Sequence, residues 1–152
     1  TGREQQFKAV FPVLYEPGVL KAVGVEAEME VEKTTIRTAG EPARIRLTAD
    51  RTKIKADGQD LSFITIEILD KEGIWEPNAN NQLTFEVKGA GTLAAVGNAD
   101  LKDTDGYVSS RRKAWKGRAI AVIKSTRKAG KITLKVSSPG LTSATVPIRT
   151  SK

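Results

Sequence analysis

The sequence predicts an all-β protein, namely a β-sandwich that is preceded by part of a second sheet. Short runs rich in Val, Ile, Thr and Phe alternate apolar with polar residues along most of the 152-residue chain. Such alternation is typical of strands with one buried face. Clusters of Gly, Pro, Asn and Asp separate these runs at the spacing of sandwich strands. No segment keeps the apolar periodicity of a helix.

The composition excludes several classes of function. The chain contains neither Cys nor His, which excludes disulfides, Cys/His zinc sites and catalytic schemes that need an imidazole. We expect no cofactor. Because no apolar run is long enough to cross a bilayer, we also expect no membrane span. The chain begins at Thr1 and its only Met is Met29, which indicates an excised piece of a longer protein.

The charge is basic, with 25 Lys and Arg against 18 Asp and Glu, or +7 overall. The lysines mostly alternate along predicted strands, as in residues 131–136, where they solubilise an outer face. The tightest basic cluster is Arg111–Lys113, which is short for a nucleic-acid site. We therefore predict that the chain has no nucleic-acid partner.

The first predicted element is a hairpin. The apolar stretch 7–15 is followed by Pro17 and Gly18, which suit a type II turn, and the strand pattern resumes over residues 19–25. Residues 25–32 continue as almost perfect alternation with Glu at every second position. We interpret this segment as a solvated surface strand and not as a metal site, because calcium ligands usually come from a loop that can wrap the ion.

A domain boundary is predicted at Thr38–Pro42, where small residues, Gly and Pro interrupt the strand pattern. The segment before it holds too few strands for an independent sandwich. We therefore expect residues 1–40 to be the C-terminal strands of a preceding β-sandwich domain and residues 41–152 to be the final domain.

The final domain is predicted to hold about seven strands in roughly a hundred residues, as an immunoglobulin-like sandwich does. The central strand is residues 61–69, whose isoleucines share one uniformly apolar face, and Asp57, Asp60 and Asp70 act as turn residues at its ends. Pro147 indicates an edge position or a bulge in the last strand. The other predicted strands are residues 43–48 with a continuation at 53–55, then 82–88, 92–96, 118–126, 131–137 and 144–149.

Aromatic residues outside these strands are candidates for binding carbohydrate, because exposed aromatic rings stack on the faces of sugars. The candidates are Trp75, Trp115 and Tyr107. The alternative is that these rings pack over the end of the sandwich or against another domain.

One loop gathers the oxygen ligands that calcium prefers, from Asn98, Asp100, Asp103 and Asp105. Leu101 falls where an EF-hand loop needs its first ligand, so that motif fails. Asn and Asp also form ordinary turns. We predict no metal site beyond these weak candidates, and we expect no residue to be catalytic.

Several segments carry a family resemblance. Residues 15–24 read YEPGVLKAVG, residues 38–43 read TAGEPA, and residues 56–61 read ADGQDL. In this order they resemble the C-terminal region of glycoside hydrolase family 2 enzymes of the β-galactosidase type, in the multidomain forms common in gut Bacteroidetes. The first is similar to the hairpin that ends the penultimate domain, the second to the junction, and the third to the start of the terminal immunoglobulin-like domain. Further similar segments are residues 49–51, 70–77, 85–91, 96–100, 117–119 and 129–132.

The resemblance implies a parent enzyme that cleaves a β-glycoside with two carboxylates on a TIM barrel, which is absent from this chain. That role is therefore not assigned to Glu67, Glu72, Glu76 or Glu86. The implied function is a non-catalytic accessory domain that supports domain packing, the oligomer or substrate access. The expected location is periplasmic, extracellular or at the cell surface.

The expected partners are the other domains of the parent enzyme and, with the aromatic candidates above, a glycan. Two alternatives stay open at this point. One is a carbohydrate-binding module that holds polysaccharide near the active site. The other is a stalk or adhesin-type bacterial immunoglobulin-like domain of a surface protein.

Overall fold

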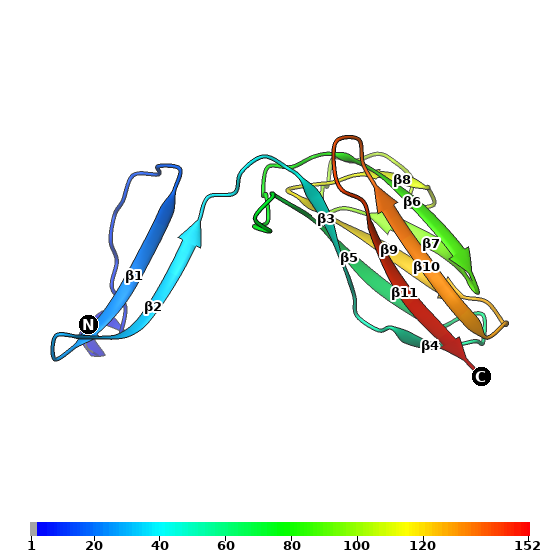
Figure 1. Cartoon of the computed structure of the whole chain (residues 1–152), viewed down its shortest axis with the longest axis horizontal. Coiled ribbons are helices and arrows are strands. Elements are labelled where there is room, and N and C mark those ends of the chain that lie inside the picture. Colours follow the sequence, from blue (N-terminus) through cyan, green and yellow to red (C-terminus); the bar gives the residue numbers. More distant parts are fainter. Residues whose placement is uncertain (1–2) are drawn as a thin grey trace. The chain divides into compact units, whose positions relative to one another are not determined.

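The computed structural model describes residues 3–152 and divides into two units (Figure 1). One unit ends at Thr38 and the other runs from Ala39 to Lys152. Apart from the 3-10 turn η1 (Arg3–Gln5), every regular element in residues 3–152 is a β-strand. No helix in this range has the length and apolar character needed to cross a membrane. The all-β prediction is confirmed.

The first unit contains a hairpin of β1 (Val19–Glu26) and β2 (Met29–Arg37), which pair antiparallel. Its turn lies at Ala27 and Glu28, whose φ values are 47° and 67°. The chain does bend at Pro17–Gly18, but residues 7–15 form no strand before this bend, so the predicted hairpin there is wrong. The predicted continuous strand over residues 25–32 is wrong as well. Left-handed turn positions favour Gly or Asn. Neither occurs at this turn, so the sequence lacked the usual signal for it.

Both strands of this hairpin are exposed along their whole length. Their exposed apolar side chains include Leu20, Met29 and Ile36, and the preceding segment adds Phe11 and Leu14. An isolated two-stranded hairpin is marginally stable in water. The first unit thus has apolar strand faces but no core of buried side chains within its described residues.

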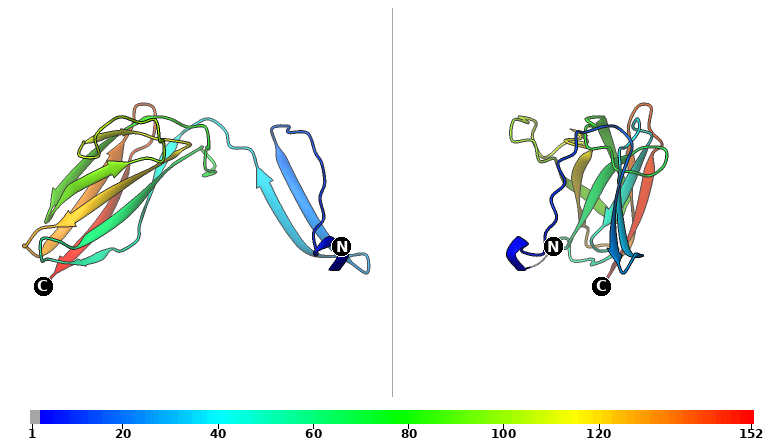
Figure 2. Two further views of the ribbon diagram at one scale, coloured as in Figure 1. Left: turned by 180° about the vertical axis from the view of Figure 1, so that it is seen from behind. Right: turned by 90° about the vertical axis from the view of Figure 1, so that its left-hand side faces the viewer.

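The second unit is a sandwich of two sheets (Figures 1 and 2). Its strands are β3 (Arg44–Ala49), β4 (Lys53–Lys55), β5 (Leu61–Leu69), β6 (Gln82–Gly89), β7 (Gly91–Gly97), β8 (Arg111–Lys113), β9 (Arg118–Ser125), β10 (Gly130–Ser137) and β11 (Ala144–Ser151). The four-stranded sheet has the order β3-β5-β9-β7, and the five-stranded sheet has the order β4-β11-β10-β6-β8. Neighbouring strands pair antiparallel except β4 and β11, which are parallel.

The core lies between the two sheets. Ile64, Ile66 and Ile68 on β5 have no exposed surface, and neither do Ile132 and Leu134 on β10 of the facing sheet. Strand β5 is central because β3 and β9 flank it. The predicted isoleucine face and the predicted sandwich are therefore confirmed, and side chains of both sheets enter one hydrophobic cluster.

Pro147 lies on β11 opposite Thr133 of β10. Strand β4 pairs with β11 only at Arg149–Ser151. At Pro147, β11 therefore has a paired strand on one side only within the described sheet, and the missing N–H breaks no ladder there. The edge interpretation of this proline is confirmed, although β11 as a whole is an inner strand.

Both outer strands of the five-stranded sheet, β4 and β8, have three residues. In each strand the middle residue is buried and the outer two are exposed. The exposed residues are Lys53 and Lys55 on β4, and Arg111 and Lys113 on β8. The edges of this sheet are thus short and positively charged.

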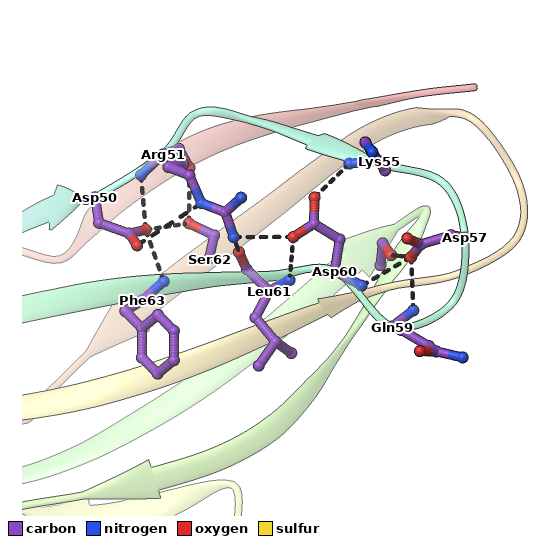
Figure 3. A network of polar contacts seen from close by, with 10 residues as sticks. Asp50, Arg51, Lys55, Asp57, Gln59, Asp60, Leu61, Ser62 and Phe63 are labelled. Carbon is purple, nitrogen blue, oxygen red and sulfur yellow. Dashed lines mark hydrogen bonds and ion pairs between the residues drawn. The ribbon is translucent and has the colours of Figure 1, made fainter.

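A network of carboxylates fixes the start of β5 (Figure 3). Asp60 accepts hydrogen bonds from the backbone N–H groups of Lys55 at 2.7 Å and Leu61 at 2.9 Å, and its Oδ1 lies 2.9 Å from Nη2 of Arg51. Asp57 accepts from the N–H groups of Gln59 and Asp60, each at 2.8 Å. These bonds confirm both aspartates as turn residues.

The same bonds determine how these carboxyl groups ionise. The backbone N–H of Lys55 and, next to it, the Arg51 side chain hold the pKa of Asp60 below its ordinary value of 3.8. The N–H groups of Gln59 and Asp60 likewise lower the pKa of Asp57. At the other end of β5, the N–H groups of Gly40 and Ile74 lower the pKa of Asp70. All three hydrogen-bonded carboxylates favour the ionised form in the folded state.

Acid is therefore expected to destabilise the second unit. A carboxyl whose pKa is lowered by folding stabilises the fold above its unfolded pKa, and this contribution is lost as the pH falls below 3.8 through the lowered pKa values. The free energy of unfolding, measured with urea, should therefore be lower at about pH 2.5 than at about pH 6. Asp60→Asn should reduce the pH dependence, and an unchanged pH dependence in this variant would contradict the assignment.

Candidate functional site

Trp115 is held on the tight turn that joins β8 to β9. Lys116 and Gly117 have φ values of 48° and 70°. The N–H of Trp115 donates to the carbonyl of Arg118 at 2.8 Å, and the N–H of Arg118 donates back at 3.0 Å. The side chain of Trp115 remains 39% exposed. Trp115 thus has a fixed backbone and is partly exposed to solvent.

Gly117 is required at this turn by a close approach as well as by its positive φ. A Cβ at this position would lie 2.1 Å from the carbonyl oxygen of Glu76 and 2.7 Å from Nε1 of Trp75. Both distances are far below van der Waals contact. Only Gly therefore allows the turn to pack against the loop before β6.

Trp115 forms one wall of a pocket of about 310 Å³. Asn80 comes from the loop before β6, and Gln82 from the first position of β6. Gln82 pairs directly with Lys113 of β8, so these two side chains lie on the same face of the sheet. The loop after β7 supplies the remaining walls, through Asn98, Asp100 and residues 102–105.

Asn98 and Asp103, which both line this pocket, bond to each other. The amide Nδ2 of Asn98 donates to Oδ2 of Asp103 at 2.7 Å and to the carbonyl of Lys113 at 2.8 Å. Its Oδ1 accepts from the N–H of Asp100 at 3.0 Å. The loop is therefore tied to β8 by the side chain of Asn98.

Arg112, on β8, is only 1% exposed, and its guanidinium bonds to the loop after β7. Its Nη1 donates to Oδ2 of Asp103 at 2.8 Å, and its Nη2 to the carbonyls of Gly106 at 2.7 Å and Asp105 at 3.1 Å. The ring of Tyr107 lies 5.7 Å from the guanidinium carbon. The buried guanidinium of Arg112 thus binds the oxygen atoms of this loop that point inward.

The four predicted calcium candidates therefore have different surroundings. The backbone N–H of Asp105 and the guanidinium of Arg112 lower the pKa of Asp103, and its carboxylate is already paired. Oδ1 of Asp100 accepts from the N–H of Lys102 at 3.0 Å, while Asp105 lines the pocket. Among residues 3–152, no group of three or more acidic side chains is placed to hold a metal ion.

The three aromatic candidates do not form one platform. Trp75 lies half-buried beside Arg118, whose guanidinium carbon is 4.1 Å from the ring centre, and its indole N–H is buried without a partner in the described residues. Tyr107 is 70% exposed and packs near Gly97 and Arg112. Neither ring lines the pocket that contains Trp115. The structure brings Trp115 together with the Asn98–Asp105 loop instead.

Three of the four glutamates singled out in the sequence make structural contacts. Glu67 bridges Arg46 at 2.7 Å and Arg118 at 3.1 Å. Although partial burial opposes ionisation, these guanidinium groups hold the pKa of Glu67 below its ordinary value. Glu76 accepts from the N–H of Asn78 at 3.0 Å, and Glu86 pairs with Lys88 at 2.9 Å.

Sequence reasoning missed Arg112, Asn80, Gln82 and Lys113. Residues 111–113 were interpreted as a solvated basic cluster, whereas β8 exposes Arg111 and Lys113 and buries Arg112. Arg112 pairs with the core residue Leu83. The alternation of this three-residue strand is too short to detect, and only the pairing with β6 reveals which arginine is inside.

Comparison with protein families gives one matching family model, described as glycoside hydrolase family 2 C-terminal domain 5, over residues 45–147. Among curated proteins, the chain is 40% identical over 136 residues to a beta-galactosidase from Bacteroides ovatus, which covers 90% of the chain and 16% of that protein. It is 32% identical over 119 residues to a beta-galactosidase from Thermoanaerobacter pseudethanolicus, covering 78% of the chain and 14% of that protein. The chain thus spans only 14–16% of the length of these relatives.

Solved structures agree with this match. A glycosyl hydrolase family 2 member from Bacteroides cellulosilyticus superposes with a TM-score of 0.84 at 38% identity, covering 92% of the chain and 18% of that structure. A beta-glycosidase from Bacteroides vulgatus gives a TM-score of 0.80 at 29% identity, covering 90% of the chain and 18% of that structure.

Proposed function

Because the chain belongs to the family of glycoside hydrolase family 2 C-terminal domains, we propose that it is a non-catalytic accessory part of a β-galactosidase-type enzyme. The observation that carries this proposal is the family match over residues 45–147, together with an alignment to only 16% of a related beta-galactosidase. The catalytic residues then belong to the rest of the parent protein. The contacts of Glu67 with two arginines support this proposal, because they fit a structural role.

The proposed role of the accessory part is to pack against other domains of its parent. Residues 1–40 are proposed to complete a preceding β-sandwich, since β1 and β2 expose Leu20, Val23, Met29 and Ile36. Neighbouring strands of the parent would bury these side chains and remove the apolar surface from water. In hydrogen exchange, the amides of residues 19–37 should exchange more slowly in the parent than in the isolated chain. Equal rates would argue against this packing.

The accessory role predicts that the hydrolytic activity belongs to the rest of the parent protein and not to this chain. The isolated chain should not hydrolyse nitrophenyl β-galactoside, whereas the parent should. The parent without residues 39–152 should keep its activity on this small substrate and unfold at a lower temperature, because its packing partner is lost. Turnover by the isolated chain, or a parent whose unfolding temperature does not respond to the deletion, would refute the proposed role.

The proposal includes a location outside the cytoplasm, in the periplasm or at the cell surface, in keeping with an enzyme that degrades carbohydrate from the surroundings. Fractionation of the source cells, with an antibody against this chain, tests it. Recovery of the parent in the cytoplasmic fraction would reject this location.

A further inference from the structure

We propose that the pocket beside Trp115 binds a neutral saccharide residue. This inference goes beyond the accessory role, since packing against other domains requires no ligand. It depends on the pocket walls described above, which combine an aromatic face with uncommitted polar groups. The pocket would hold glycan without cleaving it.

The aromatic wall is suited to a sugar ring. Trp115 exposes 39% of its surface, and its two backbone hydrogen bonds with Arg118 fix the turn that carries it. An indole face offers a flat apolar surface with a negative π-cloud, on which the C–H groups of a pyranose stack. Because the turn is already ordered, binding costs little backbone entropy.

The polar walls offer donors and acceptors that the fold does not use. Within residues 3–152, the side chains of Asn80, Lys113 and Asp105 have no hydrogen-bond partner, and neither does Oδ2 of Asp100. Gln82 makes one long bond, 3.4 Å from its Nε2 to the carbonyl of Leu83. Sugar hydroxyls both donate and accept, so this mixture of amides, carboxylates and an ammonium group matches them.

The charge of the pocket favours a neutral ligand. Asp100 and Asp105 stand against Lys102 and Lys113 on its walls. The remaining carboxylate, Asp103, is already paired with Arg112 at 2.8 Å. The lining charges therefore balance, and a uronate or a sulfated sugar would have no net attraction from them.

The lining of the pocket is also held in place by hydrogen bonds to β8. The buried Arg112 binds Asp103 and the carbonyls of Asp105 and Gly106, and Asn98 ties Asp103 to the carbonyl of Lys113. The loop is thus fixed to β8 before any ligand arrives, which reduces the ordering cost of binding. A volume of about 310 Å³ lies at the lower end of ordinary ligand pockets, which suits a single ring of a longer glycan.

The test measures saccharide binding by the whole chain. Lactose, a neutral β-galactoside, is titrated while amide resonances are followed by NMR, and a panel of neutral and acidic polysaccharides is used in affinity gel electrophoresis. We expect shifts at Trp115 and Lys113 with lactose, and retardation by at least one neutral polysaccharide. Trp115→Ala should weaken both by about tenfold or more.

The matched control is Phe63→Ala, which removes a ring of similar exposure, 43%, from the outer face of the other sheet. It should leave binding unchanged. Asn80→Ala gives a second variant at an exposed loop position and should also weaken binding, so a folding defect in Trp115→Ala would leave the test intact. The proposal fails if the folded chain binds neither lactose nor any neutral polysaccharide, if only acidic polymers retard it, or if Trp115→Ala binds normally. None of these outcomes affects the hydrolysis experiment that tests the accessory role.

Discussion

Replacing Arg112 by Met is expected to lower the free energy of unfolding of the second unit by about 3 kcal/mol. Arg112 is 1% exposed and donates to Asp103 and to the carbonyls of Val96, Asp105 and Gly106. Met keeps much of the aliphatic volume but donates to none of these oxygens. The loss is measured by urea unfolding, followed by tryptophan fluorescence.

The matched control is Arg111→Met on the same strand. Arg111 is exposed on the outer face of the sheet, so this variant should lose less than about 0.5 kcal/mol. Because Arg112 bonds to the Asn98–Asp105 loop, Arg112→Met should also increase the rate of amide hydrogen exchange in that loop. If the two variants lost the same free energy, Arg112 would not be the anchor of the loop.

Ile66→Ala is expected to cost about 3–4 kcal/mol, through lost burial and the cavity that remains. Ile66 has no exposed surface and lies in the middle of β5, between β3 and β9. Thr65→Ala removes an exposed side chain from the neighbouring position of the same strand and should cost less than about 1 kcal/mol. Urea unfolding of both variants measures the difference. A similar loss of unfolding free energy in both variants would mean that the isoleucine face of β5 does not stabilise the core.

Strand β5 shows what could be predicted from the sequence. Its period-two pattern is long enough to identify the buried face, and the aspartates at its ends could be identified as turn residues because backbone N–H groups nearby need acceptors. Asp57, Asp60 and Asp70 all accept such bonds. These features are local, so nearby residues determine them.

The hairpin and β8 show why other features could not be predicted. The turn at Ala27–Glu28 lacks the residues that favour a left-handed backbone. In β8, the inward position of Arg112 depends on pairing with β6, which lies far away in the sequence. Three residues carry too little alternation to indicate that pairing.

Only part of the candidate site could be predicted, because it too depends on pairing between strands that are distant in the sequence. Trp115 and the loop from Asn98 to Asp105 were singled out, but for two unrelated roles. The pocket unites them because the Asn98 amide bonds the carbonyl of Lys113 and because Lys113 pairs with Gln82. Cross-strand register, and not spacing along the chain, brings these side chains together.

The short basic edges of the five-stranded sheet have a consequence for crowded copies of this domain. Strands β4 and β8 each offer three residues for intermolecular β-pairing. Two β4 edges brought together would place Lys53 and Lys55 against the same residues of the other molecule, and two β8 edges would oppose Arg111 and Lys113 in the same way. Like charges directly opposite one another repel. The sheet therefore resists polymerisation through its two edge strands.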